Sequence, residues 1–525
     1  MPAALARWWA MRERRGKVYL VGAGPGASDL ITMRGAECLR RADTVIYDYL
    51  ANPDLLRLAP AKAALLPAGD IRGSGRRIDQ DALNQVLIAR ARRGETVVRL
   101  KGGDPFIFGR GGEEAEALAH AGVAFEVVPG VTSAIAAPTY AGIPLTHRRY
   151  GSFVAFLTGH RGSSKKSSAP VPWKELAAAA KRGGTLVLLM ASERMRDVLG
   201  ELVKAGLASR TPAAAIQWAT TASQRTVRAT LATLAARCER EKLGAPAVIV
   251  VGECAGLRDQ VKWFEAMPLF GKRIVVTRAR DAASGFAADL RALGADVIEF
   301  PTIEFAPPTS YAALDRAIAR LGKFDWVIFT SATGVDAFIA RVKRLGHDIR
   351  EMSRASIGAI GPATAERVRA YALRVAAMPE EYRAEAIVPA IGRRRIRGTR
   401  ILIPRAQVAR EALPEILRGA GAREVAVVHA YRTVRPKVAA ADRVREMAAA
   451  GEIDLVTFTS SSTVTNFCAM VGEPTRPIKA AAIGPITAQT AEKKGFEVVV
   501  RPMRYTVPAL AAAICDYFSG RAGAS

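Results

Sequence analysis

Cysteine is scarce in this chain, and its spacing excludes a metal-binding class of site. The 525 residues include five cysteines, which form no C-x-x-C pair and no spacing typical of metal ligands. The sequence therefore predicts no metal cofactor. We expect buried, unreactive thiols in a reducing compartment, the cytoplasm.

Long hydrophobic runs are lacking too. No apolar run approaches the ~20 residues that span a bilayer, so we expect no membrane partner. The first residues, MPAALARWWAMRERRG, are rich in arginine but have neither a long apolar stretch nor an A-x-A cleavage site. We interpret residues 1–15 as a loose N-terminal extension.

Acidic residues are too few to balance the basic ones. The chain has 76 Lys and Arg against 49 Asp and Glu, which gives a formal net charge of +27. Such a charge attracts anions, and nucleic acid is the first candidate. Aromatic residues make up only 6%, however, and the basic residues are dispersed apart from IGRRRIRGTR at 391–400. With no nucleic-acid-binding signature present, we expect no nucleic-acid partner, and a small polyanion such as a polycarboxylate suits the charge at least as well.

The rest of the composition is that of a globular α/β chain with several domains. Half of the residues are apolar, and strand-like runs alternate with alanine-rich helical patterns. A strand and a short tail end near residue 265. The segment MPLFGKRIVVTRARD then starts afresh, with Pro268 and Gly271 as breakers before a new strand. The sequence therefore predicts two halves.

The second half contains an internal repeat with three matched pairs of segments. RIVVTRA (273–279) recurs as RILIPRA (400–406), DWVIFTSATGVDAF (325–338) as DLVTFTSSSTVTNF (454–467), and AIGPATAERV (359–368) as AIGPITAQTA (482–491). Two copies are too few for a solenoid that is stabilised by stacking. The repeat therefore predicts two similar α/β lobes.

The F-T-S motif of each lobe ends a predicted strand in front of a predicted helix. Thr330 and Ser331 occupy this place in one lobe, and Thr459 and Ser460 in the other. Hydroxyl groups at such a position, together with helix N–H groups, can receive substrate carboxylates. The alternative is that they are plain helix N-caps.

Glycine is concentrated in a loop after the first predicted strand, VGAGPGASDL at 21–30. Gly22, Gly24 and Ala27 fit G-x-G-x-x-G/A, and Asp48 closes the apolar run TVIYD 26 residues after Gly22. A ribose-binding acid is expected at about that distance in a dinucleotide site. The pattern therefore leaves open an NAD(P)-dependent oxidoreductase.

The residues within this loop argue against a bound pyrophosphate. Pro25 removes one N–H group from the middle of the loop. We expect Ser28 or Asp29 to cap the following helix, several residues too late for that helix to face a pyrophosphate. The loop is better suited to an uncharged or cationic ligand.

The segment VVRLKGGDPFIFGRGGEEAEAL at 97–118 is far more specific. An apolar strand runs into Gly102 and Gly103, which are followed by Asp104, an aromatic pair and a second glycine cluster before an acidic helix start. The glycines permit close approach of the backbone to a ligand. Asp104 can accept hydrogen bonds from ribose hydroxyls or an amine.

Several motifs in this half, taken in order, resemble the tetrapyrrole C-methyltransferases, in particular the uroporphyrinogen-III C-methyltransferases. They are GAGPG, YD, GGDPFIFGRGGEE, PGVTSA, GIPLTHR and APAVIVVGE, and they cover about residues 16–262. The resemblance implies a domain at 16–265 with α/β subdomains at about 16–129 and 130–265. It also implies that S-adenosylmethionine (SAM) binds between them, that S-adenosylhomocysteine is a product, and that the chain forms a homodimer through this half.

The resemblance also assigns site residues. The SAM contacts of the family fall on Pro25, Gly102, Gly103, Asp104, Ile107, Thr132, Ser133, Met190 and Ala219. Asp48 matches a family carboxylate that is proposed as a catalytic base. One position departs from the family, which commonly has Gly-Lys after the third strand, with the lysine as proton donor. Here the pair is Gly69-Asp70, and Arg72 is a candidate for the missing charge.

The second half resembles the uroporphyrinogen-III synthases over about residues 268–520. The motifs that carry this resemblance are RIVVTRA, FTSATGVDAF, VVHAYRTV and AIGPITA. It implies a domain at 266–525 with one lobe at about 268–305 and 434–520, and the other at about 306–432. The chain would cross between the lobes at EFAPP (304–308) and YRTVRP (431–436).

One tyrosine of the second half carries a family role. Tyr431 matches a tyrosine that is placed to assist loss of the substrate hydroxyl, and the alternative is a packing tyrosine. Thr330, Ser331, Thr459 and Ser460 are the candidates for binding substrate carboxylates.

The two resemblances together imply a bifunctional enzyme of tetrapyrrole biosynthesis. The second half would cyclise hydroxymethylbilane to uroporphyrinogen III, and the first would methylate it twice to precorrin-2, on the way to sirohaem and cobalamin. Both substrates are polycarboxylates, which would suit the charge of +27. The alternatives are a chain with only the methyltransferase half active, an NAD(P)-dependent oxidoreductase, and a nucleic-acid-binding protein that uses the basic surface.

Overall fold

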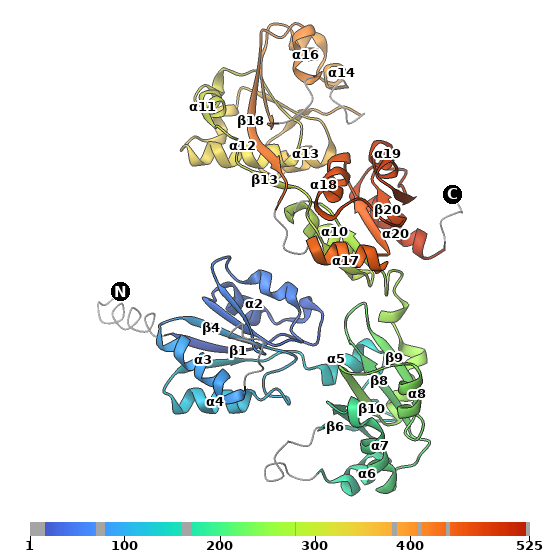
Figure 1. The fold of residues 1–525 in the computed structure, drawn as a ribbon. Helices are drawn as coiled ribbons and strands as arrows, with labels where there is room; N and C mark the ends of the chain where they lie inside the picture. The colour runs from blue at the N-terminus through green and yellow to red at the C-terminus, as the bar shows by residue number, and fades with distance from the viewer. Residues whose placement is uncertain are drawn as a thin grey trace. The chain divides into compact units, whose positions relative to one another are not determined.

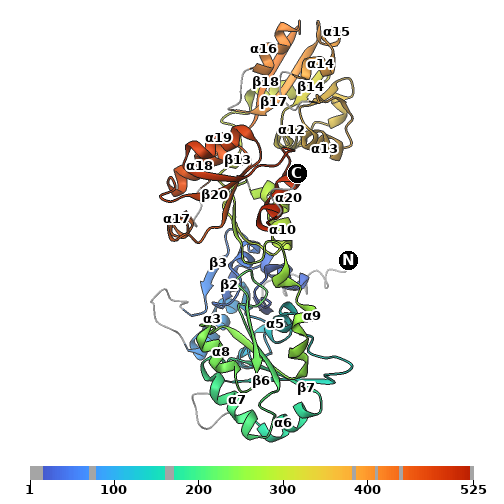
Figure 2. The ribbon, with the colours of Figure 1, turned by 90° about the vertical axis from the view of Figure 1, so that its right-hand side faces the viewer.

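The computed structural model describes residues 16–69, 79–159, 171–278, 280–380, 386–407, 412–436 and 441–520, without the side chains of 280–284. The chain separates into two compact units (Figures 1 and 2). The first unit comprises Met1–Arg273 and Leu290–Asp296, and the second comprises Ile274–Asp289 and Val297–Ser525. Both units are α/β, which confirms the predicted fold class.

The first unit begins with a parallel five-stranded sheet of order β3-β2-β4-β1-β5. Its strands are β1 (Lys17–Gly22), β2 (Thr44–Tyr47), β3 (Ala64–Pro67), β4 (Thr96–Lys101) and β5 (Ala124–Val128). Helix α2 (Met33–Arg40) covers one face, while α3 (Gln80–Arg92) and α4 (Gly111–His120) cover the other (Figure 1). Because both faces are covered, the strands are largely apolar, and β4 departs from this pattern at Arg99 and Lys101.

The second sheet of this unit is mixed, with order β6-β7-β10-β8-β9. Its strands are β6 (Phe153–Thr158), β7 (Gly184–Leu189), β8 (Pro212–Gln217), β9 (Arg225–Thr230) and β10 (Ala247–Val251). Strands β6 and β7 are parallel, and the other neighbours pair antiparallel. Helix α5 (Ser133–Tyr140) packs on one face, and α6 (Trp173–Lys181), α7 (Met195–Lys204) and α8 (Leu234–Arg240) pack on the other.

The second unit contains two sheets of similar order. The first, β12-β11-β19-β20-β21, consists of β11 (Arg273–Val276), β12 (Asp296–Glu299), β19 (Leu455–Phe458), β20 (Ile478–Ala482) and β21 (Phe496–Val500). The second, β13-β18-β17-β14-β15-β16, consists of β13 (Glu304–Ala306), β14 (Trp326–Phe329), β15 (Ser356–Ala359), β16 (Val375–Ala377), β17 (Arg400–Ala406) and β18 (Glu424–Val434).

Helices cover both faces of the larger of these sheets. On one face lie α11 (Ala312–Ile318), α12 (Ala332–Arg344) and α13 (Pro362–Ala370), and on the other lie α14 (Ile387–Ile391), α15 (Arg393–Ile396) and α16 (Ala412–Gly419). The smaller sheet packs against α17 (Ala441–Ala450), α18 (Ser461–Val471) and α19 (Pro485–Lys493) on one face. Helix α10 (Arg280–Ala292) follows β11, and α20 (Val507–Phe518) ends the described chain and contacts β20 and β21.

The structure confirms the internal repeat. Strands β11, β19 and β20 of the smaller sheet correspond to β17, β14 and β15 of the larger one, and each set lies in the same order. The F-T-S motifs end β19 and β14, and the A-I-G-P motifs end β20 and β15, each in front of a helix. The two segments expected as crossings pair with one another, because Glu304 to Ala306 of β13 run antiparallel to Arg432 to Val434 of β18.

The start of the first helix differs from the prediction. Thr32, rather than Ser28 or Asp29, is the N-cap of α2, and its side chain accepts a hydrogen bond from the N–H of Gly35. Ser28 to Leu30 form a separate short 3-10 turn, and Ile31 is extended. The helix N-terminus is therefore even further from the glycine loop, which weakens the dinucleotide interpretation.

The cysteines are free thiols, and most of them are buried. All five cysteines are free, and all except Cys515 are buried. Burial raises the pKa of Cys238 to about 11, so this thiol is unreactive at neutral pH. In the part of the chain that the structure describes, no helix is both long and apolar enough to cross a membrane.

Candidate active sites

Three glycines pack the ends of parallel strands together in the first unit. A Cβ atom on Gly22 would lie 2.5 Å from Cα of Gly130, and one on Gly130 would lie 2.2 Å from the carbonyl oxygen of Gly103. Gly24 and Gly103 also exchange backbone hydrogen bonds of 3.2 and 2.8 Å. The first glycines of the loop are thus explained by backbone packing, with no need for a pyrophosphate.

Two glycines leave open space beside this junction. A Cβ atom on Gly102 would meet only Cβ of Leu50, at 3.5 Å. One on Gly103 would lie 3.7 Å from the backbone of Thr132 and Ser133. Thr132 caps α5, and the N–H of Ser133, the first residue of that helix, lies next to Gly103. The N–H groups of Ala134, Ile135 and Ala136 are already bonded to Thr132. The structure therefore brings together four of the predicted SAM-binding residues around a space that larger side chains would fill.

Asp104 has a structural role in this loop. Its two carboxylate oxygens accept hydrogen bonds from the N–H groups of Phe106, at 2.8 Å, and Gly130, at 3.0 Å. These bonds tie the loop after β4 to the end of β5. Each oxygen keeps a further lone pair, so the predicted contact with a ligand stays compatible with the structure.

The loop after β1 also touches the loop after β8. The N–H of Ala27 donates to Oγ1 of Thr220 at 2.9 Å, and a Cβ atom on Gly26 would lie 2.9 Å from the carbonyl oxygen of Ala219. Pro25 and Ala219, predicted to bind SAM, therefore lie in neighbouring loops. The described contacts do not join Ile107 or Met190 to these residues.

The loops after β4, β7 and β8 contain residues in strained backbone conformations. Phe108, Arg110, Met190, Trp218 and Thr220 have positive φ angles between 48° and 67°. Such angles are uncommon for residues other than glycine and cluster at functional sites. Met190, which sequence statistics alone would place in a core, is 52% exposed.

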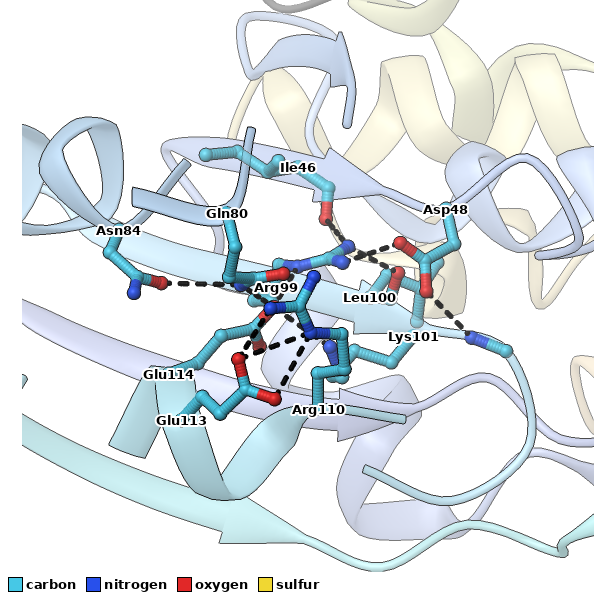
Figure 3. A network of polar contacts seen from close by, with 11 residues as sticks. Ile46, Asp48, Gln80, Asn84, Arg99, Leu100, Lys101, Arg110, Glu113 and Glu114 are labelled. Atoms are coloured by element: carbon cyan, nitrogen blue, oxygen red, sulfur yellow. Dashed lines mark hydrogen bonds and ion pairs between the residues drawn. The ribbon is translucent and has the colours of Figure 1, made fainter. Parts of the chain in front are cut away.

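Asp48 lies at the end of β2 and belongs to a network of charges (Figure 3). Its Oδ1 accepts a 2.5 Å hydrogen bond from Nη2 of Arg99, and its Oδ2 accepts a 3.3 Å bond from the N–H of Gly102. Both interactions fix the direction of the carboxylate group at the end of β2. Asp48 is also a neighbour of the open space at Gly102.

Glu114 holds the buried end of this network. It is fully buried on α4, and its Oε1 receives hydrogen bonds from Arg99 at 3.1 Å, Lys101 at 2.8 Å and Gln80 at 3.1 Å. Arg99 is 4% exposed and Lys101 is 1% exposed. Burial lowers the pKa of Lys101, and for Arg99 the ion pairs with Asp48 and Glu114 outweigh burial and raise its pKa.

The sequence analysis missed Arg99, Lys101 and Glu114. The signal that could have found them is the pair of charges in VVRLK, because a parallel strand covered on both faces is normally apolar throughout. Such charges need a buried counter-ion. Asp70 and Arg72, the positions expected to replace the family lysine, lie outside the described residues.

Tyr431 lies in the larger sheet of the second unit and is almost fully buried. Its hydroxyl is 3.0 Å from Oγ of Ser331, and its ring packs edge-on against Phe305 at 5.3 Å. Burial raises the pKa of the phenol, so it keeps its proton at neutral pH. The expected catalytic role and the alternative packing role are both compatible with this position.

The hydroxyl residues of the two F-T-S motifs differ in local role. Ser331 and Ser460 are the N-caps of α12 and α18, with side chains that accept from the N–H groups of Gly334 and Thr463. Thr330 and Thr459 directly follow β14 and β19, and within the described chain their side chains make no hydrogen bond. The hydroxyl groups of the two threonines are therefore better candidates for binding a substrate than those of the two serines.

The fold is an α/β unit with two sheets followed by a two-lobed α/β unit, and comparison with known protein families assigns an enzyme class to each. A family model described as Tetrapyrrole (Corrin/Porphyrin) Methylases matches residues 17–235, and one described as Uroporphyrinogen-III synthase HemD matches residues 284–512. A "Porphyrin biosynthesis protein HemD" from Ruminiclostridium josui is 35% identical over 92% of this chain and 95% of its own. The chain therefore belongs to the family in which a tetrapyrrole methylase domain is joined to a uroporphyrinogen-III synthase domain.

Two further matches concern the first half. A "Uroporphyrinogen-III C-methyltransferase" from Priestia megaterium is 47% identical over 45% of this chain and 98% of its own. A solved structure of the native form of uroporphyrin III C-methyl transferase from Thermus thermophilus is 35% identical, with a TM-score of 0.39, and covers 46% of this chain and 100% of its own.

From the buried network we expect that substitutions of two adjacent glutamates, Glu113 and Glu114, have very different effects on the free energy of unfolding. Glu114→Gln should destabilise the first unit by about 3–5 kcal/mol, because Arg99 and Lys101 would stay buried without their carboxylate. Glu113→Gln breaks only an exposed pair with Arg110 and should cost at most about 1 kcal/mol. Urea denaturation of the full chain, read by hydrogen exchange in first-unit peptides, measures both. Equal stabilities of the two variants would contradict the role of Glu114.

Proposed function

We propose that this chain cyclises hydroxymethylbilane to uroporphyrinogen III and methylates it twice with SAM to give precorrin-2. The observation that carries the proposal is that the two family matches are adjacent in one chain, one within the first compact unit and the other largely within the second. The second domain would thus make the substrate of the first. The product would serve the formation of sirohaem or cobalamin.

The residues of the first unit fit SAM. Gly103 lies beside the N–H of Ser133 at the start of α5, which suits a polar or carboxylate group of the ligand. Ala219 is small, and Ile107 and Met190 offer exposed apolar surface. When bound, SAM supplies an electrophilic methyl group on a sulfonium sulfur.

The chain's own contribution to methyl transfer is alignment and removal of a proton. The loops around Gly102 hold the donor, since displacement at carbon depends chiefly on the alignment of the two reactants. Asp48, held in place by hydrogen bonds from Arg99 and the N–H of Gly102, would accept the proton that the tetrapyrrole loses after methylation.

In the second unit, Tyr431 would assist the loss of hydroxyl from hydroxymethylbilane. The phenol would transfer its proton to the departing oxygen as the C–O bond breaks, so that the hydroxyl leaves as water. The phenolate would then regain a proton from the pyrrole N–H of the resulting cation. Ser331, at 3.0 Å, fixes the direction of the phenol group. Thr330 and Thr459 would hold substrate carboxylates.

Other features complete this proposal. We place the domain boundary near residue 265, a homodimer through the first unit, and the enzyme in the cytoplasm. The free thiols support a reducing compartment. The proposal assigns no role to a metal or to nucleic acid, and it takes polycarboxylate tetrapyrroles as partners of the basic chain.

Thermal unfolding distinguishes the methyltransferase from an oxidoreductase. SAM and S-adenosylhomocysteine should raise the melting temperature of the first unit, by the equivalent of about 2.7 kcal/mol at a hundred times the dissociation constant, and NADPH should not. Gly102→Val should abolish the shift because its side chain fills the space beside Leu50. Gly200→Ala, on the surface of α7, should keep the shift. Stabilisation by NADPH alone would contradict the proposal.

Removal of one hydroxyl tests the synthase site. Tyr431→Phe should lower the rate of uroporphyrinogen III formation from hydroxymethylbilane at least tenfold, since the leaving oxygen loses its donor, and the spontaneous isomer I should increase. The control is Tyr371→Phe, which removes a hydroxyl that bonds Asp336 in the same lobe. The ratio of the two isomers after oxidation to porphyrins provides the measurement. An unchanged ratio for Tyr431→Phe would assign this tyrosine to packing.

A further inference from the structure

Arg278 is partly buried, and no carboxylate of the described part of the chain forms an ion pair with it. It follows β11 by two residues in the smaller sheet of the second unit. Burial lowers the pKa of its guanidinium, and no carboxylate of the described chain acts against that effect. Other arginines differ, since Arg341 forms a 2.6 Å ion pair with Asp315 that raises its pKa. An unpaired charge in such a place destabilises a protein unless a ligand uses it.

The position of Arg278 is at the ligand-facing edge of the sheet. Strands β11 and β19 are parallel, with Val276 paired with Thr457, and Oγ1 of Thr277 donates to the carbonyl oxygen of Thr457 at 2.7 Å. Arg278 lies two residues after Val276, and Thr459 lies two residues after its partner Thr457. Arg278 therefore follows β11 at the same edge of the sheet at which the F-T-S motif ends β19, and ligands bind at this edge in open α/β sheets.

The internal repeat shows what is special about this arginine. Arg405 occupies the equivalent place in the repeat, RILIPRA, and lies within β17 of the larger sheet. Arg405 is only 4% exposed, and it interacts with another residue of the chain. The arginine at this position of the repeat therefore interacts within the protein in one lobe, whereas in the other lobe it has no ion-pair partner in the described chain and can bind a ligand.

We propose that Arg278, together with the hydroxyl of Thr459, binds a carboxylate of the acidic tetrapyrrole that the second unit acts on. A guanidinium matches a carboxylate with two parallel hydrogen bonds, a geometry that a lysine cannot reproduce. The substrate carboxylate supplies the missing counter-ion of Arg278. This inference rests on the synthase activity proposed above and adds to it a residue that selects a polycarboxylate substrate.

The test compares substrate affinity with protein stability in the full-length chain. Arg278→Met should raise KM for hydroxymethylbilane at least tenfold, while kcat for uroporphyrinogen III stays within about twofold. The melting temperature of the second unit should stay the same or rise, because an unpaired charge is replaced by an apolar side chain. Arg278→Lys should give an intermediate KM. Arg443→Met, on the exposed surface of α17, should change neither quantity.

Two results would overturn the inference. One is an unchanged KM in Arg278→Met, and the other is a lower melting temperature with kcat reduced in proportion, which indicates a structural residue. The proposed function has a separate failure. If the unaltered chain forms no uroporphyrinogen III above the spontaneous reaction, the synthase assignment itself is wrong.

Discussion

A positive charge that leaves water needs an anion beside it, and this requirement organises both candidate sites. In the first unit, buried Arg99 is satisfied from two sides by Glu114 and Asp48. That pairing fixes the carboxylate of Asp48 at the end of β2, next to the open space at Gly102. In the second unit, Arg278 has no such anion within the described chain, and in our account the substrate provides it. In our proposal, a charge withdrawn from water positions a catalytic base in one domain and binds a substrate carboxylate in the other.

The glycines and hydroxyl residues of the motifs serve the fold and the site together. Gly22, Gly103 and Gly130 allow three strand ends to meet, and a Cβ atom on the neighbouring Gly102 would contact only Leu50. Asp104 ties two loops by backbone hydrogen bonds. Ser331 caps a helix and contacts Tyr431. Sequence motifs of this kind are therefore specific because each residue meets two physical requirements.

The sequence predicts well what depends on local pattern. Strand ends, the two halves and the internal repeat follow from apolar runs, breakers and matched motifs, and the family motifs locate Asp48 and the glycine loops. It predicts poorly what depends on tertiary pairing. Glu113 and Glu114 are equivalent in the sequence, and only the packing of α4 on the sheet buries one of them. The N-cap at Thr32 was missed because an intervening 3-10 turn at Ser28–Leu30 uses the residues that resemble a cap.

The central claim is that one chain builds a tetrapyrrole ring and then methylates it. The most direct measurement supplies the full-length protein with hydroxymethylbilane and SAM labelled with ¹³C in the methyl group, and then analyses the product by mass spectrometry and isomer separation. The account predicts a tetrapyrrole of the type III series with two labelled methyl groups. A type I product, or a type III product without label, would contradict it.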